Sequence, residues 1–117
     1  MSTDDIGAQL SGWGTVASVT THGRVSGDDV VVAVGFVEEP SGSLLVAAGE
    51  PDADWALNLE VNPRCVISVG DRTWDAVAEM LNQGEAAQAV TGLILKYGTS
   101  SERLGLGPAF RLRAVGG

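Results

Sequence analysis

The chain has 117 residues, 44% of them hydrophobic, and a formal net charge of −8 at pH 7. This length fits one domain with a buried core, and the negative charge argues against a protein that binds nucleic acid through its phosphates. No stretch reaches the ~20 apolar residues of a membrane span, and the N-terminus lacks the basic and apolar regions of a signal peptide. The single cysteine, Cys65, favours a reduced, cytoplasmic setting.

The first half of the chain is predicted to form three strands joined by turns. Residues 1–12 are polar, and we expect a flexible N-terminus followed by one domain over residues 13–117. Thr and Val favour a first strand over 13–21. The nearly continuous apolar run at 29–37 predicts a strand that is central in its sheet and covered on both faces. A third strand is predicted over 43–48, after the turn at 39–42.

The second half of the chain mixes helices and strands. Asp52 is predicted to cap a helix over 53–61, which ends before the Asn62-Pro63 pair because a residue before proline disfavours the helical conformation. The apolar residues of 83–97 recur at helical spacing, which predicts a second helix that faces the core or a dimer interface. The remaining predicted strands are 64–69, 72–81 and 108–115.

The order of these elements indicates the fold class. The alternating strand–helix units of a parallel sheet are lacking, whereas consecutive strands are joined by tight turns. The sequence therefore predicts a mainly β (α+β) fold, a small antiparallel barrel with two flanking helices.

The turn at 23–27, Gly-Arg-Val-Ser-Gly, contains the single basic residue among residues 1–60, which carry ten acidic ones. Glycines allow a ligand to approach the backbone closely, turn N–H groups can surround an anion, and Arg24 adds a forked cation. The pattern therefore favours an anion site at Arg24, Ser26 and Gly27. The alternative is a glycine-rich hairpin whose arginine faces solvent.

The helix after this region carries a second candidate group. Trp55, Asn58 and Leu59 lie at positions i, i+3 and i+4, and therefore on one helix face. A tryptophan beside an amide is suited to stack on a ring and to hydrogen-bond a phosphate or a polyol chain. The alternative is that Trp55 and Leu59 belong to the core and that Asn58 ties down a loop.

Four segments in order resemble the deazaflavin-dependent nitroreductase family: GRVSG, GSLLVAAG, DWALNLEVNP and RCVISVGDRTWDAVAEML. Members of this family are split β-barrel proteins, similar in fold to pyridoxamine-phosphate oxidases. The resemblance covers about residues 15–115. Its most specific part is the string Trp-x-x-Asn-Leu-x-x-Asn-Pro, which begins here at Trp55 and ends at Pro63.

The resemblance implies an F420-dependent reductase. The expected protein is a homodimer of split barrels that binds coenzyme F420, a deazaflavin, and passes a hydride to a small organic substrate. The cofactor carries this chemistry, so the resemblance implies neither a catalytic triad nor a metal site. The cofactor contacts that it implies are Arg24, Ser26, Gly27, Ala47, Ala48, Trp55, Asn58 and Leu59.

Departures from the family pattern keep other functions open. Val25 stands where the family commonly has lysine, Asp28 and Asp29 follow the turn in place of a basic residue and a proline, and the loop over 49–52 is acidic. These changes motivate one alternative, a non-enzymatic relative that binds another small molecule or serves only as a dimeric scaffold. Another alternative is a protein that binds flavin mononucleotide, which fits the broader fold but needs the same cations. His22 beside the turn is either a proton donor or a structural residue.

Overall fold

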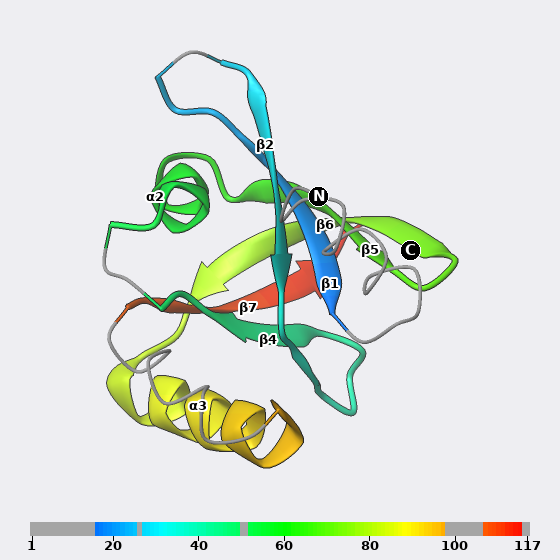
Figure 1. The fold of residues 1–117 in the computed structure, drawn as a ribbon, viewed down its shortest axis with the longest axis vertical. Coiled ribbons are helices and arrows are strands. Elements are labelled where there is room, and N and C mark those ends of the chain that lie inside the picture. The colour runs from blue at the N-terminus through cyan, green and yellow to red at the C-terminus, as the bar shows by residue number, and fades with distance from the viewer. Residues whose placement is uncertain (1–15, 26, 50–51, 98–106, 116–117) are drawn as a thin grey trace, which may run out of the picture.

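A single antiparallel sheet forms the framework of the described structure (Figure 1). The computed structural model describes residues 16–25, 27–49, 52–97 and 107–115. Within these ranges the sheet has seven strands, in the spatial order β2-β1-β5-β6-β7-β4-β3. The strands are β1 (Ala17–His22), β2 (Asp29–Val34), β3 (Val37–Glu38), β4 (Leu44–Ala47), β5 (Arg64–Val69), β6 (Arg72–Met80) and β7 (Ala109–Ala114).

The strand predicted over 29–37 is divided in two, and this division curls the sheet. β2 and β3 follow each other in sequence but lie at opposite ends of the strand order. Gly35 and Phe36 connect them, so the chain passes from one end of the sheet to the other within two residues. A β carbon at Gly35 would lie 2.9 Å from Cε2 of Tyr97, which explains the glycine at this bend. The resulting half-barrel with two helices confirms the predicted fold class.

The prediction that this apolar run is central and covered on both faces is wrong. β2 pairs with β1 alone and stands at one end of the sheet in the described part of the chain. Its residues alternate in burial, and Val31 on the outer face is 59% exposed. Both faces of β2 carry apolar side chains, but the single chain buries only one face. An apolar run therefore does not by itself show that a strand is covered on both sides.

Two helices lie against different parts of the half-barrel. α2 (Asp54–Val61) contacts β1 and β2, and α3 (Gln83–Tyr97) contacts β3, β4 and β7, as Figure 1 shows. The bounds of α3 and β5 were predicted correctly. The prediction that Asp52 caps α2 is wrong, because Ala53 occupies the cap position and no side-chain hydrogen bond caps the helix there. Neither of the described helices is long and apolar enough to cross a membrane.

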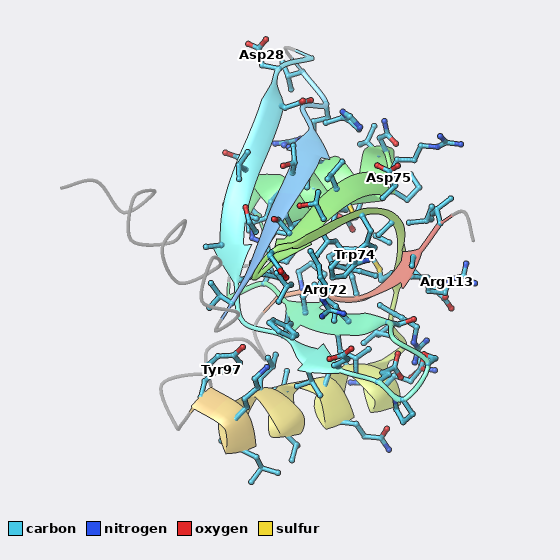
Figure 2. All side chains as sticks on the ribbon, turned by 90° about the vertical axis from the view of Figure 1, so that its right-hand side faces the viewer. Asp28, Arg72, Trp74, Asp75, Tyr97 and Arg113 are labelled. Atoms are coloured by element: carbon cyan, nitrogen blue, oxygen red, sulfur yellow. The ribbon has the colours of Figure 1, made fainter. Side chains whose placement is uncertain are left out.

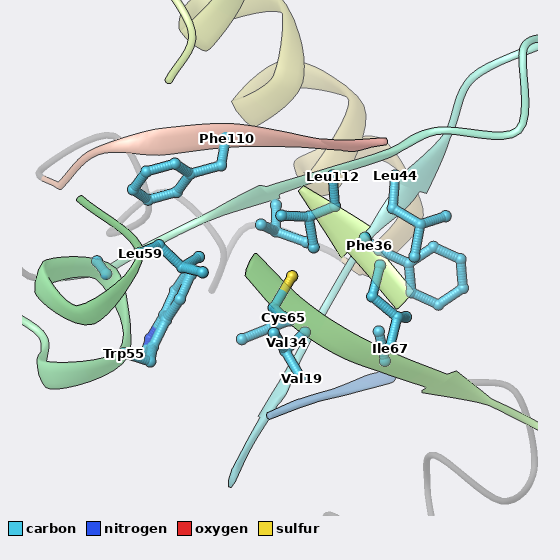
Figure 3. Packing of buried hydrophobic residues seen from close by; sticks show 14 of the residues in the cluster. Val19, Val34, Phe36, Leu44, Trp55, Leu59, Cys65, Ile67, Phe110 and Leu112 are labelled. Atoms are coloured by element: carbon cyan, nitrogen blue, oxygen red, sulfur yellow. The ribbon is translucent and has the colours of Figure 1, made fainter. Parts of the chain in front are cut away.

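The interior contains two apolar clusters. The larger one lies inside the half-barrel, where Trp55 and Leu59 of α2 point toward Phe110 of β7 (Figure 3). The smaller one joins α3 to β4 and β7 through Ala89 and Leu93, which confirms that the helix stripe faces the core. Several predictions fall on residues outside the described ranges: the flexible segment 1–12, the start of the first strand, and Ser26.

Candidate functional site

The hairpin between β1 and β2 and the helix α2 meet at Arg24. The hairpin projects beyond the rest of the sheet, with Asp28 near its tip and α3 at the opposite end of the molecule (Figure 2). Gly23 donates its N–H to the carbonyl oxygen of Asp28 at 3.0 Å, and a β carbon at Gly23 would overlap that oxygen. Gly27 has a φ of +80°, a conformation that favours glycine. These two glycines set the shape of the turn around Arg24.

The side chain of Asn58 holds Arg24 in place. Its Oδ1 accepts the backbone N–H of Arg24 at 3.2 Å and the Nη1 of the guanidinium at 2.9 Å. Its Nδ2 donates to Oγ1 of Thr21 at 3.1 Å. Asn58 is 1% exposed and Thr21 is fully buried. Both ends of the amide are therefore satisfied inside the protein, and Asn58 ties the hairpin to α2.

A second residue of α2, Asp54, also contacts the guanidinium. Its backbone carbonyl accepts from Nη1 of Arg24 at 3.3 Å, and its carboxylate lies 3.4 Å from Nη2. The side chain of Asp54 is 79% exposed, and that of Arg24 is 27% exposed. The ion pair is therefore long and exposed to solvent, unlike the shorter, partly buried hydrogen bond to Asn58. Asp54 precedes Asn58 by four residues, so both lie on one helix face, and this spacing could have identified Asp54 from the sequence.

A surface hollow lies beside these groups. Its volume is about 180 Å³, and we call it the turn hollow; it is lined by Gly23, Arg24, Val25, Val30, Asp54 and Asn58. It brings together two sequence-predicted residues that are 34 positions apart, Arg24 and Asn58. The guanidinium is the one cationic group among its lining residues. An anion that enters the turn hollow meets a forked donor whose orientation is already fixed.

Four other predicted contacts are buried in the single chain. The ring of Trp55 lies 6.0 Å from that of Phe110, tilted by 56°, and Leu59 packs in the same cluster. Ala47 and Ala48, at the end of β4, are 4% and 1% exposed. Ala48 belongs to the same cluster as Trp55 and Leu59, whereas Ala47 packs in the smaller cluster beside α3. Gly27 stays exposed on the hairpin.

The polar residues near the turn are paired with each other. Nδ1 of His22 lies 3.0 Å from Oδ1 of Asp29, across the β1–β2 pair. The described residues contain no group of three His, Cys, Asp or Glu side chains that could hold a metal ion.

A second hollow, of about 220 Å³, lies over β5 and β6 beside His22 and Asp75. Burial raises the pKa of the Cys65 thiol below it to about 11, and Asp75 adds to this shift.

Comparison with known proteins places this geometry in a family. The sequence model described as F420H(2)-dependent quinone reductase matches residues 1–100. Among solved structures, an F420-H2 dependent reductase called FDR-A has 26% sequence identity and a TM-score of 0.71, with 85% of this chain and 94% of that chain covered. No curated protein matches the sequence.

Two further structures share the fold at lower identity. The heme storage protein HutZ from Vibrio cholerae has 23% identity and a TM-score of 0.71, with 100% of this chain and 93% of that chain covered. A structure described as a domain-swapped dimer has 22% identity and a TM-score of 0.71, with 94% of this chain and 96% of that chain covered.

Proposed function

Since the chain belongs to the F420H(2)-dependent quinone reductase family, we propose that it transfers a hydride from reduced coenzyme F420 to a small organic substrate. The likeness to an F420-H2 dependent reductase over 94% of that chain supports this proposal. The observation that carries it is the guanidinium of Arg24, held at the turn hollow by Asn58 at 2.9 Å.

The residues at the turn hollow fit the anionic part of the cofactor. The phosphate and the glutamate tail of F420 need a cation and hydrogen-bond donors, and the turn supplies the guanidinium of Arg24. Because Asn58 fixes this side chain before binding, less rotamer entropy is lost when an anion arrives. Because Gly27 has no side chain, a ligand can approach its backbone closely.

The remaining predicted contacts would act through position. When bound, the deazaflavin supplies the hydride, so the chain's own residues need only bind, orient and exclude water. Ala47 and Ala48 have short side chains at the end of β4, which would suit a flat ring laid against the end of that strand. Trp55 and Leu59 are buried beneath the turn and would hold α2, and with it Asn58, in register. Ser26 is proposed as a hydroxyl donor of the turn.

We further propose a homodimer. The outer face of β2 exposes Val31, which pairs with Thr20 of β1, and Thr20 pairs with Val66 of β5. An exposed apolar end strand is a surface that proteins usually cover. A second copy of the chain on this face would cover the apolar side chains that β2 exposes in the single chain. The similar structure described as a domain-swapped dimer also supports the proposal. A cytoplasmic location is part of the same proposal.

Light scattering tests the dimer. We expect a species of twice the 12.0 kDa chain mass at micromolar concentration, and a monomer for Val31→Glu. Leu95→Glu is the matched control, because Leu95 is 83% exposed on α3, away from β2. A wild-type protein that runs only as a 12.0 kDa species would refute the dimer.

A specific observation favours the alternative of a relative that binds another small molecule. Arg24 already pairs with Asp54, and the side-chain oxygen of Asn58 already accepts two hydrogen bonds from Arg24. Fluorescence titration with coenzyme F420, in parallel with flavin mononucleotide, separates the cases. Saturable binding of F420 that is lost in Arg24→Ala supports the reductase. Binding of flavin mononucleotide alone, or of neither, rejects it.

A further inference from the structure

We infer that Asp54 is a specificity-determining residue of the turn hollow, an internal anion that a ligand must replace on Arg24. The inference rests on the proposed function, because it concerns the same guanidinium. The inference goes beyond the proposed function because it assigns a role to the carboxylate of Asp54, which competes with the ligand for Arg24. It also states which anions the turn hollow accepts.

The two partners of Arg24 differ in how easily they are replaced. The contact from Nη1 to Asn58 is 2.9 Å long, and Asn58 is itself anchored on the buried Thr21. The contact from Nη2 to the Asp54 carboxylate is 3.4 Å long, and that carboxylate is 79% exposed. An exposed pair of this length contributes little to stability. An incoming anion therefore displaces the carboxylate of Asp54 and leaves the bond to Asn58 in place.

This arrangement selects ligands by charge. A ligand with one carboxylate exchanges one weak pair for another and gains nothing from Arg24. Asp54 also stays at the rim of the turn hollow, where its charge repels any bound anion. A ligand binds well only if it carries further charges or further hydrogen-bond acceptors that reach the turn. Asp54 thus lowers the affinity for small anions and keeps the turn hollow for larger multivalent ones.

The variant Asp54→Asn tests this role. It removes the charge and keeps the size of the side chain, so we expect the affinity for coenzyme F420 and for inorganic pyrophosphate to rise about three- to tenfold at low salt. The dissociation constant for F420 is measured by its fluorescence, and that for pyrophosphate by calorimetry. In an Arg24→Ala background the same change should have a much smaller effect on the affinity for pyrophosphate, because the guanidinium for which Asp54 competes is gone and only the repulsion by its charge remains.

Asp52→Asn is the matched control. Asp52 is also exposed and lies two residues from Asp54, but among the described residues Arg24 forms its ion pair with Asp54, and Asp52 does not line the turn hollow. We expect less than about a twofold change in either dissociation constant, because this variant alters only a long-range electrostatic interaction that salt screens. Equal gains from Asp52→Asn and Asp54→Asn would overturn the inference, because the contact to Arg24 would then be irrelevant.

The two proposals fail in different ways. If wild-type protein binds F420, Arg24→Ala loses it and Asp54→Asn binds no more tightly, the role of Asp54 is refuted and the proposed function survives. If no variant binds F420 but Asp54→Asn gains affinity for pyrophosphate, the proposed function is refuted and the role of Asp54 is supported. If Asp54→Asn gains affinity for neither probe, the inference is wrong.

Discussion

The side-chain oxygen of Asn58 accepts two hydrogen bonds from Arg24, one from its backbone N–H at 3.2 Å and one from its Nη1 at 2.9 Å. One buried amide therefore fixes both the path of the hairpin and the direction of the guanidinium. The stability of the fold and the geometry of the turn hollow depend on the same side chain, and changes at Asn58 should affect both.

Replacing Asn58 by alanine should destabilise the protein by about 2–3 kcal/mol, because it leaves buried partners without hydrogen bonds. The hydroxyl of the fully buried Thr21 loses a donor, and the backbone N–H of Arg24 loses its acceptor. Urea denaturation measures the change. Asn62→Ala is the control, since Asn62 accepts one exposed bond from the N–H of Arg64 and should cost less than about 1 kcal/mol. Equal losses in the two variants would contradict the buried network.

The bend between β2 and β3 leads to a second prediction. A β carbon at Gly35 would lie 2.9 Å from the ring of Tyr97, and that ring is held by its hydroxyl, which accepts the N–H of Phe36 at 3.1 Å. Because the ring cannot easily give way, Gly35→Ala should destabilise the protein by about 1–3 kcal/mol.

Thermal unfolding followed by circular dichroism checks this value. Gly84→Ala in α3 is the matched control, because a β carbon there would meet its nearest neighbour, Oδ1 of Asn82, at 3.6 Å. Alanine in a helix is favoured over glycine by up to about 1 kcal/mol, so this variant should be as stable as the wild type or more stable. If Gly35→Ala unfolds at the same temperature as Gly84→Ala, the contact with Tyr97 does not determine which residue fits at position 35.

The elements predicted correctly depend on local signals. β5 ends at a two-residue turn, where Gly70 adopts a φ of +61°, and α3 begins after Asn82, whose side chain accepts the N–H of Glu85 at 2.8 Å. Such signals lie within a few residues of the boundary that they set. The division of the apolar run has only a weak local signal, the glycine at position 35, because the ring that packs against this bend belongs to Tyr97, more than 60 residues away.

The candidate site shows the same limit. The sequence predicted that Arg24 and Asn58 are both important, and the structure adds that they bond to each other across 34 positions. Asp54 was missed as a site residue although its spacing from Asn58 places it on the same helix face, because its contact with Arg24 depends on how α2 packs against the hairpin. Trp55 and Leu59 were placed correctly on one helix face, but whether that face meets the core or a ligand depends on the packing against Phe110.

The single cysteine provides a third prediction. Cys65 is 2% exposed, and burial raises its pKa to about 11 from an ordinary value of 9.0. At neutral pH the thiol should react with iodoacetamide only when the protein opens, much more slowly than in urea, because the thiolate is the reactive form. A raised folded pKa favours the protonated thiol, so its stabilising effect is present below pH 9.0 and is lost as the pH rises toward 11. Rapid alkylation of the native protein at neutral pH would contradict the buried position.

A fourth prediction concerns the carboxylates around Arg111 of β7. Its Nε donates to Glu39 at 2.7 Å and its Nη2 to Glu85 at 3.0 Å, which connects the start of α3 to the β3–β4 turn. The hydrogen bond from Arg111 holds the pKa of the Glu85 carboxyl below its ordinary value, and a hydrogen bond from the backbone of Asn82 lowers it further. Arg111→Met should therefore move that pKa upward, and NMR titration of the Glu85 carboxyl carbon measures the shift.

The same pair makes stability depend on pH in one direction. Because the folded pKa of Glu85 is lowered, its contribution is present above the ordinary value of 4.5 and is lost as the pH falls through the folded pKa. The difference in unfolding free energy between wild type and Arg111→Met should thus be larger at about pH 7 than at about pH 3. Arg113→Met is the control, since Arg113 is 60% exposed and pairs with Glu79 alone among the described residues. A stability difference for Arg111→Met that stays constant over this range would show that Arg111 stabilises the fold by packing and not by its charge.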